Sequence, residues 1–492
     1  MIAISNPEVH QLLDLITDGI AAFDKTGALS PNLNDTSGYM SSDFGKNNEQ
    51  AKHLSAVIAA AALQLAAIFQ PPQNLLLNLA SGAYKTAALR VCLEGNVTEI
   101  LREAGPKGAH VREISAINGL DPKILARFLR YLATLHIYRE LSPGVFANNR
   151  VSAVMDTGKD VKELFDSTDE VCKAAMLSWE TITDPAYPAI TPLNKTFPTS
   201  NRRASENHEL HEQNHEEEDA GPPDAVTIFD LLQRPEEAAR HRRFAVAMEG
   251  MSGVQPLECL SRGKSYSFYN SFRPRITAIT AYEWESLPEK AVVVDVGGGV
   301  GTISLELTKR YPKLNFVVQD LSGFVEKGSE LASYNRLAAA AHNFFKPQPR
   351  KDASIYLLRH VVHNWSDEDS IKILTRLREA AREDTKLILL EIIMPYACRT
   401  SNADTGASLD PGTVIPGASA GEAPVPLLAN FGAVNEFAYL MDITMFALCK
   451  DSSERTIDQF AVLFQKSGWK LTRVNRLAED AGMWQAIEGV PV

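Results

Sequence analysis

Apolar residues recur at helical spacing in two segments near the start of the chain, 9–23 and 49–69. A stretch rich in Gly, Ser and Asn, from about 27 to 45, separates them. Both segments are predicted to be helices that pack against other parts of the protein. The longest apolar stretch, Leu54–Phe69, is rich in alanine, contains polar residues and is short for a membrane span. We interpret it as a buried or dimer-forming helix and expect no membrane association.

A group of shorter elements follows. The pattern predicts helices over 97–104 and 110–117, and a third that opens at Asp121-Pro122 and carries one apolar stripe. The stripe consists of Ile124, Leu125, Phe128, Leu129 and Leu132. Two short apolar segments within 138–146, split by Ser-Pro-Gly, predict a small hairpin. Three helices followed by a hairpin are typical of a winged helix.

A winged helix suggests DNA binding, and residues 121–150 are locally basic. The whole chain, however, has Lys+Arg 49 against Asp+Glu 61 and a formal net charge of -12, a balance that repels a phosphate backbone. We therefore interpret this module as a dimerisation domain or a substrate lid, and we expect no nucleic acid partner.

The composition, 492 residues with 45% hydrophobic and 22% charged, allows two or more globular units. The patterns divide the chain into a helical N-terminal and winged-helix domain over 1–155, a helical connector over 156–285, and a domain of strands and helices over 286–492.

Two inserts interrupt these domains. The first, about 195–224, is acidic and poor in apolar residues, so it is predicted to be flexible. Its three histidines, His208, His211 and His215, could suit a metal by spacing, but histidines in an acidic linker are usually solvated, and no metal site is expected. The second insert, about 397–424, is rich in Ala, Gly, Ser, Thr and Pro and is expected at the surface.

The cysteines indicate a reducing compartment, because they follow neither metal-ligand nor disulfide spacing. They are Cys92, Cys172, Cys259, Cys398 and Cys449, and we interpret them as core or pocket thiols. Residues 1–10 lack the basic and apolar pattern of a secretion signal. The expected location is the cytoplasm.

Residues 291–302, AVVVDVGGGVGT, predict a buried strand that runs into a glycine turn and then into a helix. Glycines at Gly297, Gly299 and Gly301 let the backbone approach a ligand closely. Thr302 stands where the dinucleotide fingerprint needs its third glycine, so nicotinamide and flavin cofactors are disfavoured. S-adenosylmethionine (SAM), which has a methionine moiety in place of a pyrophosphate, tolerates this form of the turn.

Strands and helices alternate beyond the turn. A strand over 314–319 ends in Asp320, whose carboxylate is placed to accept both hydroxyls of an adenosine ribose. Further strands are predicted over 354–358 and 386–393, with a helix capped by Ser366 between them. The alternation predicts an α/β fold: a Rossmann-like domain with a mostly parallel sheet and a ligand crevice at the C-terminal ends of its strands.

Two ionisable residues fall at that edge of the predicted sheet. His363 lies just beyond one strand, and Glu391 lies inside an apolar strand. A carboxylate there must be paired, hydrogen-bonded or close to the sheet edge, because burying it alone is costly. The histidine is its natural partner. A structural histidine and an unrelated glutamate at a strand end remain an equal alternative from these residues alone.

On these residues and their surroundings, the chain resembles the plant and fungal small-molecule O-methyltransferases, the family that includes caffeic acid O-methyltransferase. The matching segments are 295–301 (DVGGGVG), like the first SAM motif; 319–321 (QDL), like the ribose-binding segment; 341–345 (AHNFF), like the adenine-flanking motif; and 358–367 (LRHVVHNWSD), like the segment of the catalytic base. Segments 229–235 and 242–248 resemble fungal members in particular.

The resemblance implies roles for individual residues. His363 would be the general base, steered by the carboxylates of Glu391 and Glu454. The implied cofactor contacts are Gly297, Gly299, Asp320, Leu321, Asn343, Phe344 and Arg359. The helix 435–448 would wall the substrate pocket, with Met445 and Cys449 near the substrate. A homodimer is implied as well, in which the N-terminal region of one chain helps to close its partner's pocket.

The sequence also departs from the plant enzymes. Asn343 stands where the family usually has an aspartate, Arg359 and His360 replace a lysine and a tryptophan, and Cys449 replaces a common asparagine. The two inserts are absent from plant members. The substrate is therefore not carried over from them.

We expect a SAM-dependent O-methyltransferase that acts on a hydroxyl of a small aromatic or polyketide-type secondary metabolite, with phenols best suited. Two alternatives stay open. One is a SAM-binding protein of this fold that catalyses a non-methylating rearrangement, against which His363, Glu391 and Glu454 argue jointly. The other is a winged-helix regulator that senses SAM, which the acidic charge opposes.

Overall fold

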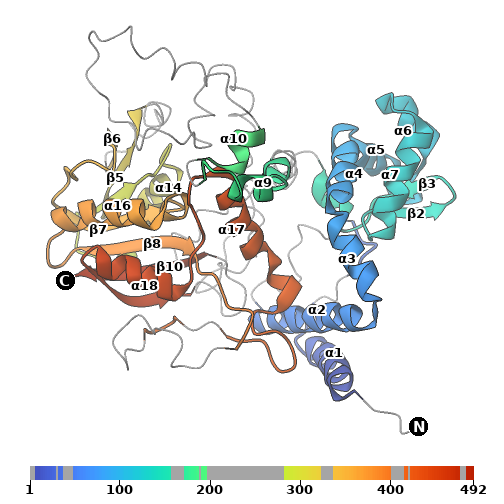
Figure 1. The fold of residues 1–492 in the computed structure, drawn as a ribbon, viewed down its shortest axis with the longest axis horizontal. Coiled ribbons are helices and arrows are strands. Elements are labelled where there is room, and N and C mark those ends of the chain that lie inside the picture. Colours follow the sequence, from blue (N-terminus) through green and yellow to red (C-terminus); the bar gives the residue numbers. More distant parts are fainter. Residues whose placement is uncertain are drawn as a thin grey trace.

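The computed structural model describes residues 6–28, 32–36, 48–156, 171–187, 190–196, 282–322, 336–399, 415–418, 421–476 and 484–492. The acidic insert at about 195–224 lies outside these residues apart from its first two positions, as do Cys259, the segments 229–235 and 242–248, and most of the insert at 397–424. Figure 1 shows the N-terminal helices on one side and a sheet of strands on the other, with α17 (Glu436–Leu448) between them.

Two N-terminal helices pair with each other and contact the C-terminal half of the chain. They are α1 (Pro7–Lys25) and α2 (Glu49–Phe69). Leu12 of α1 and Val57 of α2 share a core cluster with Leu427 and Phe431, which lie just before α17. The start of the chain is therefore attached next to the helix expected to wall the pocket.

The α2 helix is apolar well beyond its buried side. Its segment Gln50–Phe69 is, among the described residues, the one helix long and apolar enough to cross a membrane by length and composition, and 17% of that window is buried. Leu63, Ile68 and Phe69 are exposed. The expectation of a buried helix is thus wrong for most of this surface, because only the side facing α1 and residues 423–431 is covered. The dimer-forming interpretation stays a prediction.

The following region forms a compact helical group with a small sheet. Its elements are α3 (Pro72–Ala80), α4 (Gly82–Glu94), α5 (Val97–Ala104), η1 (Gly105–Lys107), β1 (Ala109–His110), α6 (Val111–Asn118), α7 (Pro122–Thr134), β2 (Arg139–Ser142), β3 (Val145–Ala147) and η2 (Ser152–Met155). The strands are antiparallel in the order β1-β3-β2. The predicted short helices and hairpin are confirmed.

The start of α7 shows why the local prediction succeeded. The Asp121 carboxylate accepts the backbone N–H groups of Lys123 and Ile124 at 2.8 and 2.9 Å, which satisfies two donors of the first turn. The predicted apolar stripe is narrower than expected: Leu125, Leu129 and Leu132 are fully buried, but Ile124 is 47% exposed.

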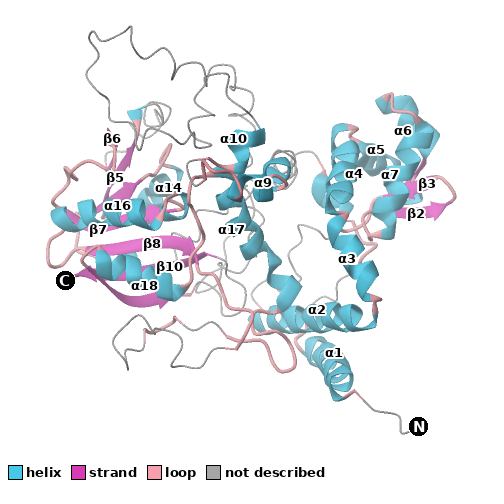
Figure 2. Cartoon of the chain, viewed as in Figure 1, coloured by secondary structure: helices cyan, strands magenta, loops and turns pink. Residues whose placement is uncertain are grey.

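The C-terminal domain is built on a seven-stranded sheet in the order β6-β5-β4-β7-β8-β10-β9, drawn in magenta in Figure 2. The strands are β4 (Val292–Val296), β5 (Asn315–Asp320), β6 (Leu337–Ala341), β7 (Ala353–Arg359), β8 (Lys386–Ile392), β9 (Trp469–Asn475) and β10 (Trp484–Pro491). The first five in this order are parallel, whereas β10 runs antiparallel to both β8 and β9. The α/β fold with a mostly parallel sheet is confirmed.

Helices cover both faces of this sheet. The helix α14 (Thr302–Arg310) contributes to one core cluster, and α16 (Asp367–Ala380) and α18 (Ile457–Lys466) contribute to the other. Neighbouring strand residues alternate between the clusters, as Tyr356 and Leu357 of β7 do, because successive side chains point to opposite faces. Ser366 caps α16 as predicted, accepting the Asp369 N–H at 3.1 Å. The remaining elements are α9 (Ser178–Ile182), α10 (Pro192–Thr196), η6 (Trp284–Ser286), η8 (Val362–Asn364) and η9 (Gly432–Asn435).

The cysteines correct one expectation. Cys92 and Cys449 are buried, but Cys398 is exposed and is therefore neither a core nor a pocket thiol. It lies beyond β8, where the chain has already left the sheet.

The adjacent parallel strands β5, β4, β7 and β8 bring the predicted site residues to one edge of the sheet. Their carboxyl ends hold Asp320, the glycine turn after Val296, Arg359 and Glu391. Ligands of open α/β sheets bind at this edge.

Candidate active site

The glycine turn after β4 has a left-handed backbone at three positions. The φ angle is 70° at Gly297, 59° at Gly299 and 78° at Gly301, values that L side chains rarely adopt. A Cβ at Gly297 would lie 2.9 Å from a methyl of Val361, whereas nothing lies within 4 Å of a Cβ at Gly299. The turn therefore packs tightly on the sheet side and leaves open space above Gly299, as a ligand crossing it requires.

Asp320 lies directly beside this turn. Its Oδ2 accepts the Gly299 N–H at 2.7 Å, and its Oδ1 accepts the Leu321 N–H at 2.8 Å. Burial raises the pKa of Asp320, and these two hydrogen bonds oppose the rise. Each carboxylate oxygen keeps a second lone pair, so the group can still accept two hydroxyls. The Leu321 side chain is 47% exposed.

The predicted adenine-side residues follow β6. The Asn343 side chain accepts the Phe345 N–H at 3.0 Å and so shapes its own turn. The Phe344 ring centroid lies 5.1 Å from that of Phe345 and 5.7 Å from that of Trp365, both edge to face. Its edge comes within 3.7 Å of the position of a Cβ on Gly297. The fold thus brings Phe344 to the glycine turn.

Arg359 ends β7 between carboxylates of the two neighbouring strands. Burial lowers its pKa to about 10, and the charges of Asp295 and Glu391 oppose that fall. Asp295 accepts the Ser304 hydroxyl at 2.6 Å, and burial raises the pKa of Asp295 to about 6. Arg359 therefore couples the glycine-turn side of the edge electrostatically to the Glu391 side.

A 3-10 turn, η8, presents His363 immediately after β7. His360, with φ at 54°, lets the chain leave the strand. The Oε1 atom of Glu391 accepts the N–H groups of Val361 and Val362, both at 3.0 Å. Glu391 is fully buried, and these bonds explain how a carboxylate is tolerated inside an apolar strand. They also fix the backbone just before His363.

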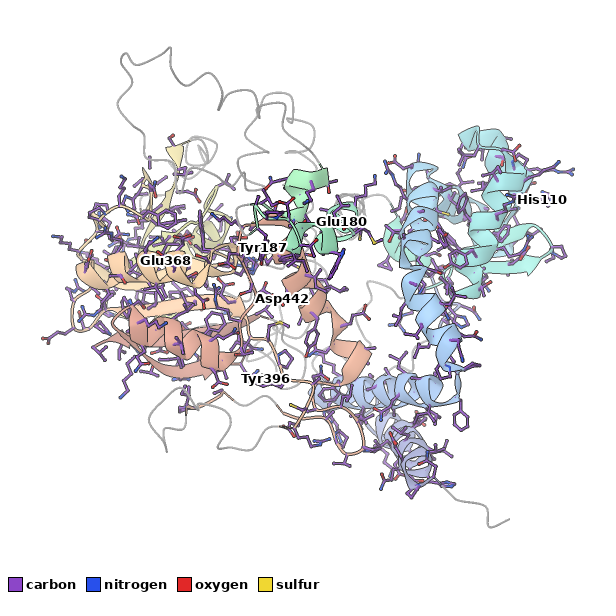
Figure 3. The ribbon with its side chains drawn as sticks, in the orientation of Figure 1. His110, Glu180, Tyr187, Glu368, Tyr396 and Asp442 are labelled. Carbon is purple, nitrogen blue, oxygen red and sulfur yellow. The ribbon has the colours of Figure 1, made fainter. Side chains whose placement is uncertain are left out.

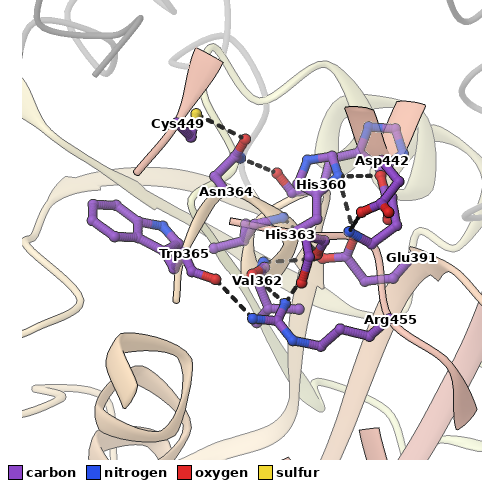
Figure 4. A network of polar contacts seen from close by, with 12 residues as sticks. His360, Val362, His363, Asn364, Trp365, Glu391, Asp442, Cys449 and Arg455 are labelled. Carbon is purple, nitrogen blue, oxygen red and sulfur yellow. Dashed lines mark hydrogen bonds and ion pairs between the residues drawn. The ribbon is translucent and has the colours of Figure 1, made fainter. Parts of the chain in front are cut away.

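His363 and Glu454 form a direct hydrogen bond, 2.8 Å between Nδ1 and Oε1. Glu391 Oε2 lies 3.8 Å from the same nitrogen, and Figure 4 shows Glu391 beside His363. The Glu454 N–H is in turn donated to Asp442 at 2.9 Å. Burial alone lowers the pKa of His363, but the charges of Glu454 and Glu391 and the hydrogen bond to Glu454 outweigh it and raise the pKa to about 9. Glu454 bonds Nδ1, so the hydrogen bond to this carboxylate does not use the other ring nitrogen, Nε2.

Glu391 is buried beside His363, and each group affects the pKa of the other. Burial raises the pKa of Glu391 to about 7, against the opposing charge of His363. The second oxygens of both Glu391 and Glu454 are buried without a hydrogen-bond partner. A positive charge on the imidazole would offset part of the cost of burying them.

The same three residues form the one group of His, Cys and acidic side chains in the described part of the chain that could hold a metal ion, with ligand atoms within 4.8 Å of one another. The 2.8 Å contact between His363 and Glu454 is itself a hydrogen bond of ordinary length. The orientation of a histidine by carboxylates accounts for the cluster.

The two predicted pocket residues lie near the chain on either side of the His363–Glu391 pair. Met445 of α17 is buried in a cluster with Ile392 and Met394, which follow Glu391 in the chain. Cys449 is buried, and its Sγ lies 3.9 Å from Asn364 Oδ1, next to His363. Their contacts with a substrate stay predictions.

Sequence reasoning missed Asp442 and Arg455. Figure 3 places Asp442 on α17 in the middle of the molecule, where it holds the backbone of Glu454. A single charged residue inside the otherwise apolar segment FAYLMDITMFAL was the available signal. Arg455 is 1% exposed, and its only signal was its position beside Glu454.

This fold and edge define the class of SAM-dependent methyltransferases, and comparisons identify the family. Residues 274–413 match the O-methyltransferase domain, and residues 77–157 match the O-methyltransferase dimerisation domain. The chain is 38% identical over 467 residues to 4-O-methyltransferase 1 of Phanerochaete chrysosporium, covering 88% of each. It is 32% identical over 466 residues to an O-methyltransferase of Armillaria gallica, covering 91% of this chain and 90% of that one. The chain belongs to the fungal-type O-methyltransferase family and is a SAM-dependent O-methyltransferase.

Solved structures share the fold. OxaC superposes with a TM-score of 0.64 at 20% identity, covering 98% of this chain and 99% of its own. The mitomycin 7-O-methyltransferase MmcR has a TM-score of 0.58 at 20% identity, covering 88% of this chain and 99% of its own. At these identities the likeness concerns architecture alone.

Proposed function

We propose that this enzyme methylates a phenolic hydroxyl of a small aromatic or polyketide-type secondary metabolite, with His363 as the general base. The observation that carries the proposal is the buried hydrogen bond of 2.8 Å between His363 and Glu454 at the carboxyl edge of the sheet. A phenol suits such a site, because its ordinary pKa, about 10 for a tyrosine-like hydroxyl, is within reach of an imidazole held by carboxylates.

The residues of the glycine side would hold SAM. They are Gly297, Gly299, Asp320, Leu321, Asn343, Phe344 and Arg359. When bound, SAM supplies a methyl group on a positively charged sulfur. The open space above Gly299 and the spare lone pairs of Asp320 fit a ribose, and the Phe344 ring next to the turn offers an apolar surface to the adenine.

His363 would act on the substrate hydroxyl. Glu454 accepts the Nδ1–H of the neutral ring, which leaves the Nε2 lone pair to take the phenolic proton. The charges of Glu454 and Glu391 then stabilise the imidazolium, as their effect on the pKa of His363 indicates. Met445 and Cys449 would position the ring of the substrate, and positioning supplies most of the rate gain.

We also propose a homodimer in which the N-terminal region of one chain helps to close its partner's pocket. Support comes from the match of residues 77–157 to a dimerisation domain and from Leu76, Leu77 and Leu79, which are 66%, 66% and 68% exposed. A monomer by light scattering at micromolar concentration would contradict this proposal.

The domain division at 155 and 285 and a cytoplasmic location remain proposals as well. The four cysteines of the described residues are not joined in disulfides, and their scattered spacing is the support for a reducing compartment.

The central test incubates purified enzyme with labelled SAM and a panel of phenolic polyketides, flavonoids and hydroxybenzoates, followed by mass spectrometry. At least one phenol should gain a methyl group on oxygen. If SAM binds by calorimetry and only non-phenolic acceptors are methylated, the substrate class is wrong. If His363→Ala methylates the best acceptor at the wild-type rate, the assigned base is wrong.

A further inference from the structure

We propose that Arg455 is a positioning residue that clamps the turn carrying His363 against the catalytic edge. The proposal rests on the role of His363 in the proposed function. Arg455 contacts neither the glycine turn nor Asp320 through any hydrogen bond of the described residues, so its effect on the site is expected on the side of His363 rather than on the side of the cofactor.

Arg455 is one of the largest fully buried side chains of the described residues, with 1% exposed. A guanidinium stays charged in a protein interior and is expensive to bury unless its donors are satisfied. It donates to Val362 O at 2.8 Å, Trp365 O at 2.7 Å and Asp367 Oδ1 at 2.8 Å, with longer bonds to Ser453 O at 3.3 Å and Ser370 Oγ at 3.4 Å. All five N–H donors of the guanidinium therefore have an acceptor.

These partners lie on both sides of His363. Figure 4 shows the guanidinium reaching the carbonyls of Val362 and Trp365, which stand immediately before and two residues after the histidine. Glu391 holds the N–H groups of Val361 and Val362 from the other side. The turn is therefore fixed through its donors by a carboxylate and through its acceptors by a guanidinium, so the backbone cannot rotate without breaking charged hydrogen bonds.

The segment that supplies Arg455 also supplies the partner of the imidazole. Glu454 bonds Nδ1, and the next residue holds the backbone, so ring and turn are positioned by one dipeptide. This dipeptide is itself joined to the continuation of β8: Met394 N–H is donated to Arg455 O at 2.9 Å. A change at Arg455 should therefore displace His363 relative to Glu454 rather than loosen a distant surface.

The surface ion pair cannot explain the burial of Arg455. Asp367 has a side chain that is 63% exposed, and an exposed partner contributes little to stability. The two backbone carbonyls of the turn accept the shortest or equally short bonds from the guanidinium, and the Ser370 hydroxyl reaches the same two carbonyls only at 3.2 and 3.4 Å. The planar guanidinium can donate to both carbonyls and to Asp367 at once, whereas the ammonium group of a lysine lacks this geometry.

The charge of Arg455 gives the proposal an independent readout. Groups facing His363 are Glu391 from β8, Glu454 and Arg455 from the segment before α18, and His360 from its own turn. The two glutamates raise the pKa of His363 and Arg455 lowers it. Removing the positive charge should move the pKa of His363 further up, whereas a lysine should leave it near its wild-type position.

The experiment compares Arg455→Met and Arg455→Lys with Arg382→Met, which removes an exposed, ion-paired arginine just beyond the C-terminal end of α16. S-adenosylhomocysteine affinity by calorimetry should stay within about threefold for all three. We expect kcat to fall by about 10²-fold in Arg455→Met, at the low end of the loss of an acid-base group, and by about tenfold in Arg455→Lys. Arg382→Met should keep wild-type kcat.

Histidine-labelled NMR, with the His363 signal assigned by its loss in His363→Asn, supplies the second readout. The pKa of His363 should rise in Arg455→Met and stay in place in Arg455→Lys.

Wild-type kcat in both variants would overturn the proposal, as would an equal fall of kcat and cofactor affinity without a change in that pKa. If Arg455→Met fails to fold, Arg455→Lys decides: a lower kcat with unchanged cofactor affinity supports the clamp, and an unchanged kcat refutes it. If His363→Ala is fully active the base assignment itself fails, whereas an inactive His363→Ala beside active Arg455 variants overturns only the clamp.

Discussion

Glu454→Gln should separate two effects of a carboxylate on a catalytic histidine. The negative charge raises the pKa of the ring, and the hydrogen bond holds the ring in place. The change removes one negative charge and nearly preserves shape, at a contact of 2.8 Å to Nδ1. The pKa of His363 is raised to about 9 from an ordinary 6.5. This corresponds to a preference of about 3 kcal/mol for the charged ring. Since burial lowers the pKa of His363 and Glu454 is the main cause that raises it, the variant should have a pKa near or below the ordinary value.

The pH dependence of kcat is set by the protonation state of His363. The base must be neutral to accept a proton, so wild-type activity should rise with pH through about 9. At pH 7 about one ring in a hundred is neutral in the wild type, whereas most are neutral in the variant. The variant ring, however, is a weaker base and is held less firmly. We expect kcat to fall by about 10²-fold at pH 10 but by about tenfold or less at pH 7, with the acid limb moved down by about two pH units.

The assay is the pH profile of kcat with one phenolic acceptor at saturating SAM, from pH 6 to pH 10. Glu379→Gln is the matched control, because Glu379 is an exposed glutamate on α16 with a surface ion pair. Its profile should overlay that of the wild type. A loss by the same factor at every pH in Glu454→Gln would show that Glu454 does not set the protonation of His363, and the electrostatic reasoning would be refuted.

Three further outcomes are expected. His363→Ala should lower kcat by about 10²- to 10⁴-fold, while SAM affinity by calorimetry changes little. A phenol acidic enough to ionise unaided should partly rescue the activity of this variant. Turnover at the wild-type rate would show that His363 is structural. Asp320→Ala should weaken the binding of SAM and S-adenosylhomocysteine, with no binding of NAD by either form, and unchanged SAM affinity would remove the ribose assignment. Deletion of residues 202–220 should leave fold and activity nearly intact, because the segment has too little apolar surface to offset the entropy of ordering, and loss of soluble expression would show the opposite.

The sequence determined the features that depend on neighbouring residues. The glycine turn, the strand ending in Asp320 and the Ser366 cap were all predicted, because φ angles above zero, two-residue alternation and unpaired first-turn donors are local constraints. The same holds for the Asp121 cap of the winged-helix region. The order in which these elements follow one another was enough to predict a mostly parallel sheet.

Only the tertiary structure decided which distant residues meet. His363 and Glu454 are 91 residues apart, and from the sequence their pairing could be implied only by resemblance. The contacts of Arg455 and Asp442 could not be predicted either, because a single charged residue in a segment shows no periodicity and does not indicate which distant groups it will bond. The antiparallel placement of β10 between β8 and β9 was likewise invisible. Local geometry depends on adjacent residues. Burial depends on segments that are far apart in the chain and that shield a side chain from water only after they pack together. The pKa of His363 depends on this burial and on the two distant glutamates, so only the tertiary structure determines it.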